Sequence, residues 1–289
     1  MRSLVIDSPA KINLALRVVG KRKDGFHELV TLFHRISLKD ELVLRKKETG
    51  IRLVCSHPRV PIEGNLTIKA FHLLKKHHPF KGGVSVTLQK KIPVGGGLGG
   101  GSSNAAAFLL GVNRLFRLGL SRQKLMEIGA ELGADVPFFI SKARHAIGLG
   151  RGDRISSLPF KRRLWFLLFP SGRGLSTRKV FGAFRAGRRL TEANHDVRMG
   201  SAFLEQGDLN RAGAFLKNDL QEVAERIRPS LKKTKKTLSA LHLGICQMSG
   251  SGPTLFITLT SSHKAKQAFN ELRRKQPQQK VILCHSEAL

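Results

Sequence analysis

The segment 93-PVGGGLGGGSSNAAAFL-109 constrains the fold more than any other, because six of the seven residues from 95 to 101 are glycine. Glycine loses more backbone freedom on folding than any other residue, so this many are retained only where side chains would be in the way. The strand-like run 84-VSVTLQKKI-92 precedes the loop, and a helical pattern from about Ser102 to Arg117 follows it. Regular structure on both sides argues against a flexible linker.

This loop departs from two well-known phosphate-binding patterns. Gly95-x-Gly97-x-x-Gly100 formally matches the dinucleotide fingerprint, but a second amphipathic helix follows instead of a strand that ends in an acid. The ATPase P-loop pattern fails, since the position of its lysine holds Gly101. A wide main-chain loop at a helix N-terminus remains, with backbone N–H groups and the helix dipole available to an oligophosphate.

The composition limits the class of protein. A chain of 289 residues with 41% hydrophobic content suggests one large domain or two ordinary ones. No run of about 18 apolar residues and no signal-peptide core is present, so we expect a cytoplasmic protein with no membrane partner. Its three cysteines, Cys55, Cys246 and Cys284, are expected to be reduced thiols.

The formal charge of +31, from 51 Lys and Arg against 20 Asp and Glu, favours polyanionic partners such as phosphorylated small molecules, nucleic acid or a membrane surface. The basic residues are scattered, and no segment interleaves basic and aromatic residues in the manner of RNA-binding proteins. We therefore expect no dedicated nucleic-acid binding. The histidines show no metal-ligand spacing, so no protein-bound metal is assigned.

The order of predicted elements indicates an α+β protein of two lobes. Strands are expected over 3–19 with a break at Pro9, over 28–44 with a break near Lys39 and Asp40, and over 51–55 and 84–92. Helices are expected over 65–76, over 102–117 and from a Ser121 cap to Gly133, and 136–140 reads as buried and extended. A turn-rich stretch after residue 150 places the division at 1–155 and 156–289, with helices and a final strand pair near 245–283 in the second part.

Asp135 stands out because it follows a helix stop and precedes the apolar run 136-VPFFI-140, where a carboxylate is costly to bury without a partner. Its spacing alone fits either a helix-end aspartate or a site residue. Lys11 fits an exposed strand residue equally well, Phe26 a core phenylalanine and His27 a solvated histidine. At this level these alternatives stay open.

Several segments together resemble one family. The segment 93-PVGGGLGGGSSNAAA-107 resembles the second motif of the GHMP small-molecule kinases, and 248-MSGSGPTLF-256 resembles the third. Within that superfamily, 8-SPAKINLALRVVGKRKDGFHEL-29, 133-GADVPFFI-140 and 148-GLGRGDRI-155 are similar to signatures of the 4-diphosphocytidyl-2-C-methyl-D-erythritol kinases. The ordered set spans residues 8 to 256, nearly the whole chain.

The resemblance implies a two-lobed GHMP kinase fold, with an N-terminal lobe like ribosomal S5 domain 2 and a ferredoxin-like α/β C-terminal lobe. It implies ATP and Mg²⁺ as cofactors and a small-molecule cytidylyl substrate. The reaction would be phosphorylation of the 2-hydroxyl of 4-diphosphocytidyl-2-C-methyl-D-erythritol, on the methylerythritol phosphate route to isoprenoids. A monomer or a homodimer is expected.

The resemblance also assigns roles to residues. Asp135 and Lys11 match the catalytic pair, Asn13 lies in the same site, and Phe26, His27 and Phe181 would bind the cytosine, with Phe26 standing where the family usually has tyrosine. Ser103 is the expected contact to Mg²⁺. The ATP-binding residues implied are Asn65, Pro93, Gly95, Gly96, Gly97, Leu98, Gly99, Gly100, Gly101, Ser102 and Ser103.

Two other functions would account for part of the sequence. Another GHMP kinase, acting on homoserine, a mevalonate or a sugar, would share the glycine loop but not 25-GFHEL-29. A non-catalytic basic protein that binds RNA or DNA would rest on the +31 charge alone, and its binding would fall steeply with salt and not depend on Asp135.

Overall fold

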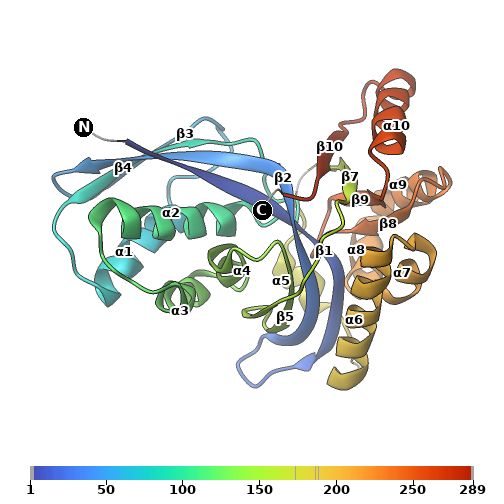
Figure 1. The fold of residues 1–289 in the computed structure, drawn as a ribbon, viewed down its shortest axis with the longest axis horizontal. Coiled ribbons are helices and arrows are strands. Elements are labelled where there is room, and N and C mark those ends of the chain that lie inside the picture. The colour runs from blue at the N-terminus through green and yellow to red at the C-terminus, as the bar shows by residue number, and fades with distance from the viewer. Residues whose placement is uncertain (1–2, 173, 186, 188, 288–289) are drawn as a thin grey trace.

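The N-terminal runs fold into one long antiparallel hairpin, β1 (Ser3–Lys21) and β2 (His27–Lys47), which crosses the molecule (Figure 1). We describe a computed structural model that covers residues 3–172, 174–185, 187 and 189–287. The breaks predicted within these two strands are wrong. A register shift between Pro9 and Ala10 accommodates the proline inside β1. Asp40 is buried within β2, because backbone N–H groups and the ammonium group of Lys90 bind its carboxylate.

The first sheet has the order β3-β4-β2-β5-β6, with β1 paired to β2. Its other strands are β3 (Ile51–Cys55), β4 (Gly83–Gln89), β5 (His145–Gly150) and β6 (Arg154–Ser157). One face is covered by α1 (Leu66–His77), α2 (Gly100–Phe116), α3 (Arg122–Leu132) and α4 (Val136–Ser141) (Figure 1). The side chains of Asn65 and Ser121 cap α1 and α3, and the cap at Ser121 was predicted.

The prediction of an extended run over 136–140 is wrong, because these residues form the short helix α4. Five consecutive buried side chains hide the helical period, so the pattern does not distinguish a buried strand from a buried helix. Pro137 lies in the first turn, where its missing N–H leaves no helical hydrogen bond unmade. The helix places Asp135 at its N-cap.

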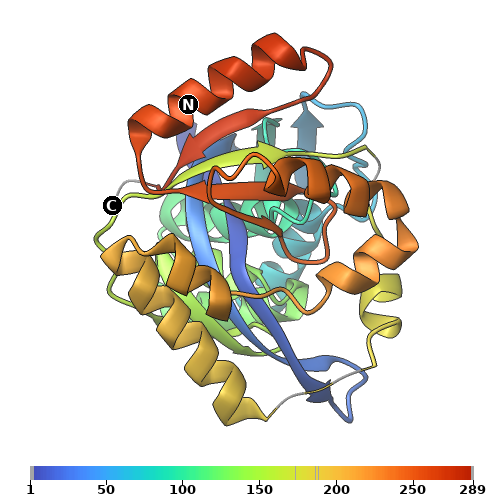
Figure 2. The same ribbon diagram turned by 90° about the vertical axis from the view of Figure 1, so that its right-hand side faces the viewer.

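The second sheet is antiparallel, with the order β10-β7-β9-β8. Its strands are β7 (Trp165–Phe169), β8 (Ile245–Met248), β9 (Leu255–Leu259) and β10 (Ile282–His285). The helices around it are α5 (Thr177–Gly182), α6 (Leu190–Gln206), α7 (Leu209–Phe215), α8 (Gln221–Ile227), α9 (Pro229–Ser239) and α10 (Ser262–Lys275) (Figure 2). The two-lobed α+β prediction is confirmed, whereas the boundary after residue 155, which falls within β6, stays a prediction.

A hydrophobic cluster joins the lobes by packing side chains of β1 and β2, such as Ile12 and Leu32, against Phe166 and Phe256 of the second sheet. None of the helices in the described part of the chain is long and apolar enough to cross a membrane.

Two histidines are buried where the lobes meet. His34 of β2 and His145 of β5 share a hydrogen bond between their Nδ1 atoms (2.9 Å). Their Nε2 atoms are bonded to the hydroxyl groups of Ser286 and Ser201 in the other lobe (both 2.8 Å). Burial, followed by the nearby charge of Arg144, lowers the pKa of His145 to about 3, and burial also holds the pKa of His34 well below its usual range.

This pair predicts acid sensitivity. Between pH about 6.5 and about 3 the unfolded chain binds protons at these imidazoles that the native state does not, so stability falls as the pH falls. Urea unfolding between pH 7 and pH 4.5 should show a loss on the order of 1 kcal/mol per pH unit for each histidine. His145→Gln should flatten this dependence, whereas His195→Gln, at an exposed position, should not. An equal slope for wild type and His145→Gln would contradict the assignment.

Candidate active site

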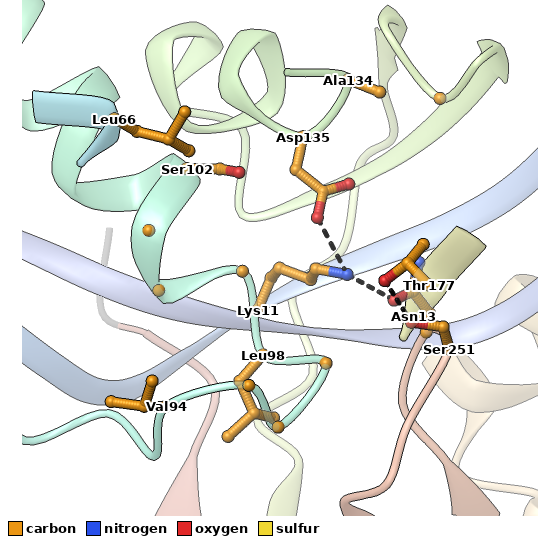
Figure 3. Close-up of a pocket in the computed structure, with 18 of the residues that line it drawn as sticks. Lys11, Asn13, Leu66, Val94, Leu98, Ser102, Ala134, Asp135, Thr177 and Ser251 are labelled. Atoms are coloured by element: carbon orange, nitrogen blue, oxygen red, sulfur yellow. Dashed lines mark hydrogen bonds and ion pairs between the residues drawn. The ribbon is translucent and has the colours of Figure 1, made fainter. Parts of the chain in front are cut away.

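A pocket of about 570 Å³ opens at the glycine loop, and we call it the glycine-loop pocket. The loop and the first turn of α2 form one wall, and Lys11 of β1 and Asp135 of α4 project into it (Figure 3). Gly250 and Ser251, from the turn between β8 and β9, close the side toward the second lobe. The pocket therefore combines segments from both lobes.

Lys11 and Asp135 form an ion pair, with Nζ 3.2 Å from Oδ2 (Figure 3). Lys11 is 3% exposed, and its ammonium group also donates to Oδ1 of Asn13 (2.5 Å), the residue on the same face of β1. Asn13 in turn donates to the hydroxyl of Thr31 on β2 (2.7 Å). This chain of hydrogen bonds fixes the lysine, while the Asp135 side chain stays 31% exposed toward the pocket.

The glycines of the loop are required by close backbone contacts. Gly97 has φ +76°, and a Cβ there would lie 2.3 Å from the carbonyl oxygen of Ser249. Gly99, with φ +69°, is the N-cap of α2, and a Cβ there would crowd the side chain of Lys11 at 3.0 Å. Without side chains, the loop packs against Lys11 and the second lobe, and the N-terminus of α2 faces the pocket.

The segment 248–254 of the second lobe forms hydrogen bonds with the glycine loop and with β1. The hydroxyl of Ser249 donates to the carbonyl oxygen of Gly97 (2.9 Å) and accepts from the backbone N–H of Asn13 (3.3 Å). Asn218 donates to the carbonyl oxygens of Met248 and Gly250 and so holds this segment in the second lobe. The glycine loop and β1 are thus tied to the C-terminal lobe through one serine.

A second pocket adjoins the first and contains Phe26, so we call it the Phe26 pocket. Phe26 is 53% exposed after the turn at Asp24, and the rings of His27 and Phe181 lie 5.2 Å apart across the lobes. Partial burial and then the charge of Lys21 lower the pKa of His27. A neutral imidazole has one donor and one acceptor, and an open phenyl ring provides a stacking surface, which together suit a heterocyclic base.

Comparisons with known proteins identify the family. Residues 65–143 match the GHMP kinases N terminal domain and 201–278 match the GHMP kinases C terminal domain. The chain is 41% identical over 268 residues to 4-diphosphocytidyl-2-C-methyl-D-erythritol kinase of Syntrophus aciditrophicus, covering 92% of this chain and 93% of that one. The enzyme of that name from Moorella thermoacetica is 39% identical over 282 residues, with 96% and 98% covered. The chain belongs to the family of 4-diphosphocytidyl-2-C-methyl-D-erythritol kinases.

The resemblance inferred from the motifs is thereby confirmed. A crystal structure of 4-(cytidine 5'-diphospho)-2C-methyl-D-erythritol kinase superposes on this kinase with a TM-score of 0.82 at 32% identity, covering 99% of this chain and 100% of that one. A homoserine kinase from Cytophaga hutchinsonii has a TM-score of 0.77 at 18% identity, covering 100% and 95%. The second likeness shows a common fold alone. The GHMP kinase fold class is confirmed as well.

The predicted site residues of the kinase fall into three groups. Lys11, Asn13 and Asp135 lie together in the glycine-loop pocket, and Phe26 and His27 line the Phe26 pocket, with Phe181 on the wall of both. The predicted ATP-binding residues that line the glycine-loop pocket are Asn65, Pro93, Gly95, Gly96, Gly97, Leu98, Gly99, Gly100, Gly101 and Ser102.

Ser103 does not line this pocket, contrary to its predicted position. It is 1% exposed and its hydroxyl accepts a hydrogen bond from Ser8 of β1 (2.8 Å). Ser102 and Ser103 both lie in the first turn of α2, which begins at Gly100, and successive residues of a helix point in directions about 100° apart. Ser102 faces the pocket, whereas Ser103 faces the sheet.

Sequence reasoning missed Lys90 and Arg151, which also line the pocket. The ammonium group of Lys90 is bonded to Asp40, which is buried in β2 and also accepts from Asn104 of α2 (2.9 Å). The polar residue inside an apolar strand pattern at Asp40 was a signal of this ion pair, because such a carboxylate requires a partner. Arg151 lies within 148-GLGRGDRI-155, a segment that carries the resemblance, but no role was assigned to it, since a basic residue in a Gly-rich turn is ordinary in a chain of this charge.

The contacts at Gly97 predict a large effect of one methyl group. Gly97→Ala should destabilise the kinase by about 2–4 kcal/mol, because the new Cβ meets a carbonyl oxygen in a left-handed backbone conformation. Gly101→Ala is the matched control, since it lies within α2 and its Cβ would only touch Leu66 at 3.7 Å. It should be neutral or gain up to about 1 kcal/mol. Urea unfolding measures the free energy of unfolding of both variants. Equal values would contradict the prediction, because they would show that the loop can move to accept the Cβ at position 97.

Proposed function

We propose that this kinase transfers the γ-phosphoryl group of ATP to the 2-hydroxyl of 4-diphosphocytidyl-2-C-methyl-D-erythritol. The observation that supports this most directly is the placement of the Lys11–Asp135 pair between the glycine loop on one side and the Phe26 pocket on the other. The relatives that carry this substrate in their names support the same assignment.

Asp135 acts as the general base. It is the carboxylate in the glycine-loop pocket among the described residues, and it stands at the N-cap of α4, outside the helical ladder. A hydroxyl placed against its free oxygen loses its proton to the carboxylate as the oxygen attacks phosphorus. General base catalysis of this kind contributes typically about 10²–10⁴-fold in rate.

Lys11 places a fixed positive charge beside the reacting hydroxyl. Its ammonium group is held by Asp135 and Asn13, so its position requires no rearrangement when negative charge develops on the transferred group. The low exposure of Lys11 excludes water from this side of the reaction and strengthens the interaction.

The glycine loop and the N-terminus of α2 hold the triphosphate by backbone N–H groups, and Asn65 lies on the wall where the nucleoside would sit. Mg²⁺ would spread the charge of the phosphates during transfer. Oxygen donors that line the pocket and suit such a hard cation include the Ser102 hydroxyl and the Asp135 carboxylate. The described residues bring together no cluster of three or more His, Cys, Asp and Glu side chains for a metal ion, so phosphate and water would complete its coordination.

The cytosine ring would lie in the Phe26 pocket, stacked on Phe26 and Phe181, with His27 bonded to its edge. Phenylalanine at position 26 keeps the stacking surface but has no hydroxyl. Five residues line both pockets, so one substrate that extends along them would reach both the cytosine site and Asp135.

Cytoplasmic location, a monomeric or homodimeric state and the absence of dedicated nucleic-acid binding stay predictions from the sequence.

Removing the catalytic pair should abolish turnover and spare nucleotide binding. Asp135→Asn and Lys11→Ala should each lower kcat by about 10²-fold or more and change the Kd for ATP by less than about threefold. Steady-state kinetics with the cytidylyl substrate, and ATP titration by calorimetry, measure the two quantities. A kcat near that of wild type in both variants would refute the proposed mechanism. A panel with homoserine and mevalonate tests the acceptor.

Stacking on Phe26 is tested separately. Phe26→Ala should raise the KM for the cytidylyl substrate by about 10-fold, as the loss of an aromatic contact of 1–2 kcal/mol requires, with the KM for ATP unchanged. Phe26→Tyr should leave this KM at the wild-type value, because tyrosine provides the same ring. An unaltered KM in Phe26→Ala would place the base elsewhere.

A further inference from the structure

The glycine-loop pocket and the Phe26 pocket share a wall, and this wall carries a positive charge. Leu29, Ala134, Arg151, Thr177 and Phe181 line both pockets. Arg151 is the single charged residue among these shared lining residues of the described chain. A ligand that reaches from the Phe26 pocket to Asp135 along this wall would lie beside the guanidinium group.

The turn between β5 and β6 fixes the arginine at this place. Gly150 and Gly152 have φ +72° and +95°, and a Cβ on Gly150 would lie 2.9 Å from Oδ1 of Asp153. The tight turn brings Asp153 back onto Arg151. One carboxylate oxygen accepts from both Nε (2.8 Å) and Nη2 (2.6 Å) of Arg151.

The remaining contacts hold the guanidinium on the shared wall. Nη2 also donates to the carbonyl oxygen of Ala130 (3.2 Å), and the group lies 5.0 Å from the ring centroid of Phe26. Nη1 donates to none of the residues that the structure describes, and the side chain remains 27% exposed. The arginine is thus oriented by three groups and keeps one terminal nitrogen for a ligand.

The other cations of the two pockets are less suited to a group on this wall. Lys21, Arg178 and Arg185 line only the Phe26 pocket. Lys11 and Lys90 line only the glycine-loop pocket, and their ammonium groups are bonded to Asp135 and Asp40.

We propose that Arg151 binds the diphosphate of the cytidylyl substrate. This rests on the proposed function: cytosine in the Phe26 pocket and the acceptor hydroxyl at Asp135 leave the diphosphate that links them at the shared wall. Guanidinium groups recognise phosphate oxygens by directed, charge-assisted hydrogen bonds, and Nη1 is available for one. Arg151 also backs the ring of Phe26, so the same residue joins base and phosphate recognition.

The test compares two probes that differ only in the diphosphate, cytidine and cytidine diphosphate. Calorimetry on the full-length kinase should show that the wild type binds cytidine diphosphate more tightly than it binds cytidine. Arg151→Ala should weaken cytidine diphosphate by about 10–100-fold and cytidine by less than about threefold, as loss of a charged hydrogen bond predicts. In turnover, the KM for the cytidylyl substrate should rise and the KM for ATP should not.

Two matched controls use nearby arginines. Arg154→Ala removes a neighbour on β6 whose side chain is 67% exposed and bonded to Glu28, and Arg178→Ala removes a cation of the Phe26 pocket alone. Neither should alter the preference for cytidine diphosphate over cytidine. Arg151→Lys should keep part of the preference that Arg151→Ala loses, because lysine keeps the positive charge but lacks the planar guanidinium group.

Three outcomes would overturn the inference. In Arg151→Ala, the affinities for cytidine and cytidine diphosphate could fall equally, which would make Arg151 only a support for Phe26, or neither affinity could fall. The third outcome is that Arg178→Ala, and not Arg151→Ala, removes the preference for cytidine diphosphate. Failure of the proposed function looks different. Wild type would then bind neither probe and consume no ATP with the cytidylyl substrate, which would overturn both proposals.

Discussion

Lys11 and Asp135 come from distant parts of the chain and meet at 3.2 Å, and the site is arranged around this ion pair. A buried ammonium group is costly unless its charge is balanced and its donors are bonded, and here Asp135 and Asn13 meet both needs. The pair also joins β1 to α4. The position of the Asp135 carboxylate therefore depends on the packing of a six-residue helix against the long hairpin.

A buried carboxylate, that of Asp40, holds the side of the site that contains the glycine loop. Asp40 accepts from the backbone N–H groups of Lys91 and Ile92, from Asn104 of α2 and from the ammonium group of Lys90. Through these contacts Asp40 of β2 binds both the residues that precede the glycine loop and the helix α2 that follows the loop. The loop itself carries almost no side chains, so its shape is fixed by the groups at its two ends and by Ser249 behind it.

Much of this site was predictable from local patterns. Caps at Asn65 and Ser121 and the glycine loop before a helix follow from rules that involve residues close in sequence. The predictions failed where a distant partner decides. Asp40 looked like a strand break because its partner, Lys90, lies on a different segment, and α4 looked extended because burial on all sides hides its period.

The sequence by itself determined the α+β class, the glycine loop that opens a helix, and the family, since motifs and periodicity are properties of neighbouring residues. The tertiary structure decided which side chains share a pocket. It turned Ser102 to the pocket and Ser103 to the sheet, brought Lys11 to Asp135, and placed Arg151 on the wall between two pockets. These outcomes depend on where a helix begins and on how two lobes pack, and a side chain's direction is not fixed until both are set.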